Sequence, residues 1–180
     1  GSSTGANFTY QWTTTNGTIA SGPNTLQPTV TTAGTYNFVV TNGANGCTSS
    51  ASATVTANLT PPTVAIAQPG IITCNQLQIP LDGAGTSTGN EFKYQWGTQN
   101  GQIVSGSATL QPTVSKAGAY TLVVTNTTNN CTSSASISVT ADVTPPVANA
   151  GQPETLNCVL TSLTLDGSGS SQGANFTYQW

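Results

Sequence analysis

The sequence repeats itself with a period of 84 residues. Residues 10–12, 94–96 and 178–180 all read Tyr-Gln-Trp, and residues 1–84 align with residues 85–168 without a gap. This alignment gives 46 identical positions. Self-similarity at a fixed period is the signature of tandem copies of one structural unit. We therefore expect the chain to fold as successive copies of one unit.

Two consecutive prolines mark each boundary between copies. Pro61-Pro62 and Pro145-Pro146 interrupt the pattern at equivalent positions. Proline has no backbone N–H and cannot continue a β-ladder as a donor. We therefore assign residues 1–60 to the C-terminal part of one repeat, residues 61–144 to a complete repeat, and residues 145–180 to the N-terminal part of the next.

Within the complete repeat, apolar and polar residues alternate as they do in half-buried strands. The pattern predicts strands around residues 63–72, 77–81, 92–96, 110–114, 120–125 and 135–139. Asn100-Gly101 is a strong hairpin signal. In the second predicted strand, Leu77, Ile79 and Leu81 share one face. Six to eight short strands at this spacing predict an all-β fold, a β-sandwich.

The aromatic residues are expected to form the core. A small sandwich has to bury its few large side chains, which disfavours the alternative of a sugar-stacking platform on Phe92, Tyr94 and Trp96. Residues 117–120 and 33–36, Ala-Gly-x-Tyr, match a tyrosine corner. The residues expected in the core are Tyr10, Trp12, Tyr36, Phe92, Tyr94, Trp96, Tyr120, Tyr178 and Trp180.

Residues 165–170, followed by Tyr178 and Trp180 and in the earlier copies by Ala-Gly-x-Tyr, resemble the immunoglobulin-like PKD domain. The resemblance covers the whole chain and is strongest to tandem copies in large bacterial surface and secreted proteins. It implies tandem immunoglobulin-like (PKD-like) β-sandwiches in a linear array. In that family such arrays are stalks, adhesin shafts or spacers beside secreted hydrolases, which implies an extracellular or cell-surface location.

The composition excludes several functional classes. Charged residues make up 4% of the chain, with two Lys and Arg together and a net charge of −3, so nothing neutralises the phosphates of a nucleic acid. Histidine is absent, which removes Ser-His-Asp catalysis and histidine metal sites. No apolar run approaches the ~18 residues of a membrane span. We expect no cofactor, and as partners neighbouring repeats, other copies of the array and glycans.

The acidic residues do not predict a catalytic pair or a metal site. Asp82 and Asp166 occupy the same position in successive repeats, and Glu91 is replaced by asparagine in the other copies. A glycosidase needs two carboxylates roughly 5–10 Å apart, and calcium needs about six to eight oxygen ligands. The region from Asp142 to Glu154 supplies too few. We expect Asp82 to cap a turn, and no catalytic or metal-binding residue.

The cysteines are expected to form disulfides, because no CxxC spacing and no histidine supports a metal site. Pairing Cys74 with Cys131 inside one repeat is one alternative. In the usual sandwich topology these residues lie at opposite ends, roughly 20 Å apart, whereas a disulfide needs Cα atoms within about 7 Å. We therefore favour pairing between neighbouring repeats. The candidates are Cys47, Cys74, Cys131 and Cys158.

The leading interpretation is an extracellular structural repeat array that forms a stalk or fibre and is not an enzyme. The alternatives are an adhesin or carbohydrate-binding shaft, and spacer domains of a secreted hydrolase. Asn-x-Ser/Thr sequons mark candidate N-glycosylation sites. They are Asn7, Asn16, Asn58, Asn126, Asn130 and Asn175.

Overall fold

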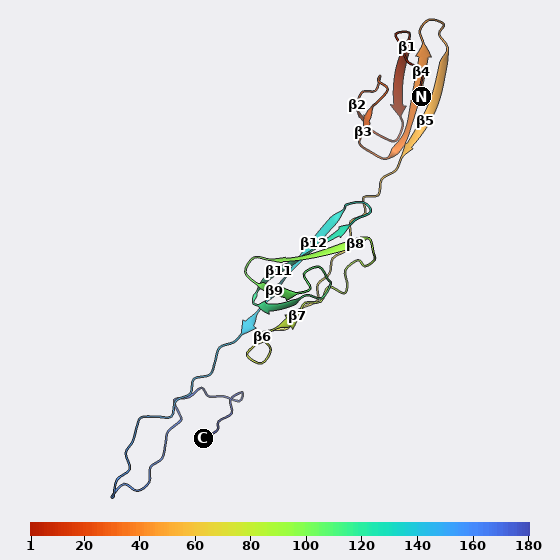
Figure 1. Ribbon diagram of the computed structural model, residues 1–180. Coiled ribbons are helices and arrows are strands. Elements are labelled where there is room, and N and C mark those ends of the chain that lie inside the picture. Colours follow the sequence, from red (N-terminus) through yellow and green to blue (C-terminus); the bar gives the residue numbers. More distant parts are fainter. The chain divides into compact units, whose positions relative to one another are not determined.

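The computed structural model describes all residues from Gly1 to Trp180, and every regular element in it is a β-strand (Figure 1). It contains no helix with the length and apolar character needed to cross a membrane. The chain divides into two compact units: Gly1–Pro61 with Thr127–Cys131, and Pro62–Asn126 with Thr132–Trp180. The predicted all-β fold class is confirmed.

The first unit is built on a three-stranded antiparallel sheet in the order β1-β4-β5. Its strands are β1 (Phe8–Thr14), β4 (Gly34–Asn42) and β5 (Thr48–Val55). A separate antiparallel pair is formed by β2 (Ile19–Ser21) and β3 (Thr29–Val30). Tyr36 and Phe38 of β4 are buried, and the ring of Phe38 stacks on Trp12 with centroids 4.5 Å apart. Alternate residues of β4 thus carry the core of this unit.

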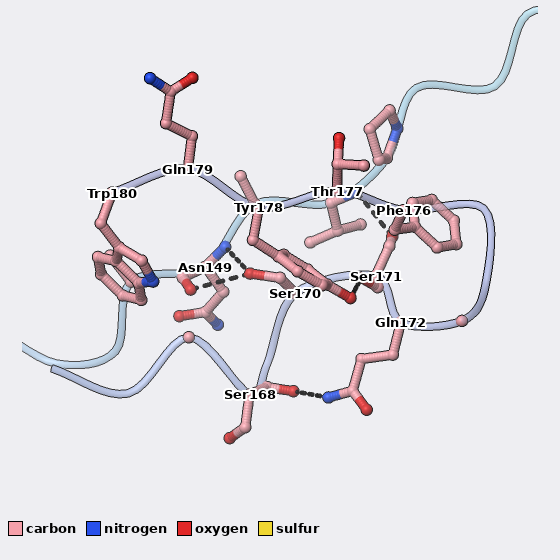
Figure 2. A pocket seen from close by; sticks show the side chains of 16 residues that line it. Asn149, Ser168, Ser170, Ser171, Gln172, Phe176, Thr177, Tyr178, Gln179 and Trp180 are labelled. Atoms are coloured by element: carbon pink, nitrogen blue, oxygen red, sulfur yellow. Dashed lines mark hydrogen bonds between the residues drawn. The ribbon is translucent and has the colours of Figure 1, made fainter.

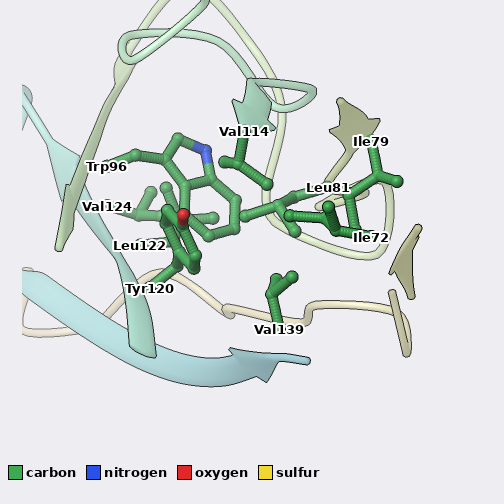
Figure 3. Packing of buried hydrophobic residues seen from close by; sticks show 9 residues of the cluster. All are labelled: Ile72, Ile79, Leu81, Trp96, Val114, Tyr120, Leu122, Val124 and Val139. Atoms are coloured by element: carbon green, nitrogen blue, oxygen red, sulfur yellow. The ribbon is translucent and has the colours of Figure 1, made fainter. Parts of the chain in front are cut away.

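The second unit contains the complete repeat apart from Pro61 and Thr127–Cys131, with eight strands between residues 72 and 142. An antiparallel sheet in the order β12-β11-β8 faces a smaller antiparallel sheet in the order β7-β10-β9, and β6 pairs with β13 in parallel (Figures 1 and 3). The strands are β6 (Ile72–Thr73), β7 (Ile79–Pro80), β8 (Phe92–Thr98), β9 (Gln102–Ser105), β10 (Thr113–Lys116), β11 (Gly118–Asn126), β12 (Thr132–Val139) and β13 (Ala141–Asp142).

The core of the complete repeat lies between these two sheets (Figure 3). Tyr120, Leu122 and Val124 are successive alternate residues of β11, and all three are fully buried, as the period-two pattern predicts. A buried aliphatic or aromatic side chain stabilises the fold by about 1.5–3 kcal/mol. The cluster consists of Ile72, Ile79, Leu81, Trp96, Val114, Tyr120, Leu122, Val124 and Val139.

The strand predicted for residues 63–72 is wrong except at its end, where β6 begins at Ile72. Residues 63–71 form no ladder, although Val64 and Ile66 pack on the core. Backbone bonds join Ser87 N to Thr63 O and Ala67 N to Asp82 O. Between them a side chain takes the place of the ladder, since Ala65 N donates to Thr86 Oγ1 and Thr86 Oγ1 donates back to Ala65 O. The alternation of residues 64 and 66 therefore marks a buried face without marking a strand.

Two further expectations need correction. Leu77 is 62% exposed, because β7 begins only at Ile79, whereas Ile79 and Leu81 are buried as predicted. Asn100-Gly101 lies between β8 and β9, but these strands belong to different sheets, so the turn is a corner and not a hairpin. Its glycine avoids contact with the ring of Tyr120 and has no positive φ.

Candidate functional site

In the first two copies, the same hydrogen bond positions the tryptophan of the Tyr-Gln-Trp motif. Trp96 Nε1 donates to Thr109 O at 2.9 Å, and Trp12 Nε1 donates to Thr25 O at 3.1 Å. Trp96 is 2% exposed, so it belongs to the core and offers no surface for sugar stacking. Phe92 is half-buried against the same core. In the complete repeat this aromatic face therefore lies in or against the core.

The tyrosine that precedes each tryptophan makes a matching contact in all three copies. Tyr94 Oη donates to Ser87 O at 2.9 Å. Tyr10 donates in the same way to Ser3 O, and Tyr178 to Ser171 O. This bond ties the Gly/Ser/Thr loop to the strand that follows it. Tyr94 and Tyr10 are half-buried, whereas Tyr178 is 59% exposed.

Both copies of the Ala-Gly-x-Tyr motif form a tyrosine corner. Tyr120 Oη donates to Lys116 O, four residues upstream, and accepts from Gln102 N at 2.9 Å. Tyr36 Oη likewise donates to Thr32 O at 2.7 Å. Both tyrosines are buried. This hydroxyl holds the corner between the two sheets and makes it a structural position.

A pocket lies among residues 146–180, and both Tyr178 and Trp180 line it (Figure 2). The expectation that these two residues are buried is wrong: Trp180 is 77% exposed. Residues 145–180 form no strand, so no sheet covers these side chains. Tyr178 Oη donates to Ser171 O in the lining of this pocket (Figure 2).

The acidic residues that repeat between copies cap turns. Asp82 Oδ1 accepts from Ala84 N at 2.9 Å, and Asp166 Oδ1 accepts from Ser168 N at 2.8 Å. Hydrogen bonds from the side chain and then the backbone of Ser168 lower the pKa of Asp166 below its ordinary value of 3.8. No three acidic or cysteine residues of the chain gather into a group that could hold a metal ion. The geometry supports the turn-capping role of Asp82.

The four cysteines are unpaired in this structure. Cys74 follows β6 in a tight turn closed by two bonds between Thr73 and Gln76, each 3.1 Å long. Cys158 occupies the equivalent turn, where Asn157 N donates to Leu160 O. Cys74 is exposed and Cys131 is half-buried.

The other two cysteines are each held by an asparagine two residues upstream, which is not among the predicted site residues. Cys131 N donates to Asn129 Oδ1 at 2.9 Å, and Cys47 N donates to Asn45 Oδ1 at 3.0 Å. Each of these cysteines immediately precedes the last long strand of its repeat: Cys131 precedes β12, and Cys47 precedes β5. The recurring Asn-x-Cys spacing was the signal that could have identified this turn.

The candidate glycosylation sites lie mostly on the surface. Asn126 is half-buried near the end of β11, while the other five asparagines are exposed. Asn16 is exposed but its side-chain oxygen accepts from Thr35 N at 3.0 Å. Whether any of them carries a glycan stays a prediction.

No family model matches the chain, and no curated protein matches it by sequence. Among solved structures, it is similar to three N-terminal domains of the Highly Immunogenic Outer Capsid protein (Hoc) of bacteriophage RB49. That match has a TM-score of 0.39 and 18% identity, and it covers 82% of this chain and 51% of that one, about half its length. A second match is to domains 4 and 5 of the S-layer protein SbsC, with a TM-score of 0.28 and 18% identity over 75% of this chain and 70% of that one. Because both TM-scores are low, the assignment of the all-β fold rests on the sheets and the core of this chain itself.

Proposed function

We propose that the chain is part of an extracellular structural array, in which tandem immunoglobulin-like, PKD-like sandwiches form a stalk or fibre without catalysis. The observation that carries the proposal is the path of the chain through the complete repeat. Asn129, in the turn between β11 and β12, donates to Thr60 O at 3.0 Å, just before the repeat begins. The chain therefore enters the repeat beside this turn.

The chain leaves the repeat at the opposite end. β12 starts at Thr132, directly after the turn, and β13 continues the same course to Asp142. Ten residues of extended chain at about 3.3 Å each span roughly 33 Å. A unit that is entered at one end and left at the other adds its own length to an array, which suits a spacer or shaft.

The distribution of side chains supports the same proposal. The aromatic residues of the complete repeat lie in the core or pack against it, and the exposed face of β12 carries serine and threonine. The acidic side chains at repeated positions bond to their own turns. These arrangements stabilise the fold and leave the repeat with the features of a building unit.

Electron microscopy of the native assembly tests the proposed function. We expect filaments or stalks with an axial period of about 35–45 Å, or twice that value, since strand length plus loops sets the length of one repeat. The sample is purified from the producing organism without proteolysis. Discrete compact particles of a few repeats would show that the chain is a module and not a fibre component.

A further inference from the structure

We propose that Cys74 forms a disulfide with the counterpart of Cys131 in the following repeat, so that each junction of the array is covalently bridged. The inference rests on the proposed function, because it requires a further repeat after residue 144. It specifies which two cysteines meet, and it follows from contacts in single repeats and their adjoining linkers.

A disulfide within the complete repeat is excluded by the course of β12. Cys131 directly precedes Thr132, the first residue of β12. Cys74 directly follows Thr73, which pairs with Asp142 of β13 beyond the far end of the same strand. About ten extended residues, roughly 33 Å, separate these positions. Two cysteines can be bridged only when their Cα atoms lie within about 7 Å.

The end of the repeat that carries Cys74 is the end where the chain leaves. Asp142 pairs with Thr73 and is followed by the linker of residues 143–145. Cys74 is exposed at this end, in the turn closed by Thr73 and Gln76. Its thiol is therefore accessible beside the linker that leads to the next repeat.

The Cys131 turn lies against the linker that leads into its own repeat. Asn129 Nδ2 donates to Asn58 Oδ1 at 3.1 Å and to Thr60 O at 3.0 Å. The side-chain oxygen of Asn129 accepts from Cys131 N at 2.9 Å. One asparagine thus connects the cysteine to the linker that precedes its repeat.

Both contacts involve the same position of the 84-residue repeat. Asn58 and Asp142 are 84 residues apart and are therefore equivalent. The Cys131 turn contacts Asn58, and Asp142 is the backbone partner of Thr73, the neighbour of Cys74. In an array, position 142 would therefore have two neighbours. One is Cys74 of its own repeat, and the other is the turn that holds the Cys131 equivalent of the next repeat. Both thiols are then brought to the same short segment.

The reaction is a two-electron oxidation. Two thiols exchange with an external disulfide, such as the active-site disulfide of an extracytoplasmic thiol oxidoreductase, and form one new S–S bond while the donor leaves as two thiols. Such a bond belongs to an oxidising extracellular location. Cys47 and Cys158 are the equivalents of Cys131 and Cys74, so each takes a partner at the junction it faces.

Non-reducing peptide mapping of the intact native array tests the proposal. Free thiols are alkylated first, and the protein is cut with chymotrypsin because two lysines give trypsin few sites. We expect the Cys74 peptide joined to the peptide with the Cys131 equivalent of the next repeat. The copies are distinguishable, since residues 43–46 differ from residues 127–130 at three of four positions. A Cys74–Cys131 peptide, an alkylated Cys74 or a Cys74–Cys74 link between chains would overturn the proposal.

A single substitution in the full-length protein provides a second test. Cys74→Ser should release one alkylatable thiol in the following repeat and leave Cys131 bonded to the preceding one. Asn75→Ala, in the same turn, serves as the control and should leave the map unchanged. Release of Cys131 instead would show pairing inside the repeat. Electron microscopy of the native array separates the proposed disulfide from the proposed structural function. Filaments whose cysteines are all free thiols would contradict only the disulfide.

Discussion

A side chain at Gly101 would collide with the ring of Tyr120, and this contact makes the corner of the sandwich dependent on glycine. We expect Gly101→Ala to destabilise the complete repeat by about 1–3 kcal/mol, because the tyrosine must move off its hydrogen bonds. The readout is urea unfolding followed by tryptophan fluorescence in a background with Trp12→Phe and Trp180→Phe, so that the signal comes from Trp96, which is buried in the same core.

Gly97→Ala is the matched control for this substitution. Gly97 lies in β8, and a β-carbon built there meets nothing within 4 Å. We expect a change within about 0.5 kcal/mol. Equal effects of the two substitutions would show that the contact with Tyr120 is not what requires glycine at position 101.

The hydroxyl of Tyr120 is the second residue-scale feature with a measurable effect. Tyr120→Phe removes the donor to Lys116 O and the acceptor for Gln102 N, in a buried setting. We expect a loss of about 1–3 kcal/mol, because both backbone groups lose their partner. Tyr178→Phe is the control, since its hydroxyl bonds to Ser171 O in an exposed region. Thermal unfolding of both variants should show a lower Tm for Tyr120→Phe alone.

At the scale of elements, one side chain satisfies the middle of the segment 63–67, whose ends bond to Ser87 and Asp82. Thr86 is 4% exposed and satisfies both the N–H and the C=O of Ala65. Thr86→Val keeps the shape and removes both bonds, and we expect a loss of about 1–3 kcal/mol. Hydrogen exchange should accelerate most at the amide of Ala65. Thr121→Val, which removes an exposed bond to Ser136, should leave that amide unchanged.

The strands that were predicted correctly are those in which a ladder and a buried face coincide. In β11 and β12 every second residue points to the core and every residue also pairs with a neighbour, so the alternation marked both. Val64 and Ile66 alternate in the same way, but the backbone of Ala65 between them bonds to the side chain of Thr86. A hydrophobic pattern reports burial, and it cannot show which group satisfies the backbone.

The two turns that matter most were predictable to different degrees. Asn100-Gly101 carried a hairpin signal because this dipeptide favours positive φ, yet Gly101 is required for the space beside Tyr120. The cysteines were recognised as disulfide candidates, but the contact of Asn129 with Asn58 joins positions 71 residues apart. Such a contact depends on the folded arrangement and leaves no pattern within a short window of sequence.

For the whole molecule, the scarcity of charge predicts a stability that depends little on pH. The pKa of Asp166 is lowered, so its ionised form is favoured in the folded state, and this contribution is present above the ordinary pKa of 3.8. It is lost only as the pH falls through the lower folded value. We expect a constant Tm between about pH 5 and about pH 7 and a decline below pH 3.8.

A pH series of thermal unfolding curves checks this expectation, with Asp166→Asn as the comparison because it removes the ionisable group. The variant should show a smaller decline in acid than the parent. A Tm that shifts by more than about 5 °C between pH 5 and pH 7 would indicate an ionisation that the folded repeat depends on.

The chain enters the complete repeat beside the turn before β12 and leaves it at the end of β13. A pulling force transmitted along an array would therefore act parallel to β11 and β12. Hydrogen bonds between strands run perpendicular to them, so tension loads the whole β11–β12 ladder in shear at the same moment. In this geometry the bonds of the ladder would have to break together, and a higher force is needed than when they break one after another.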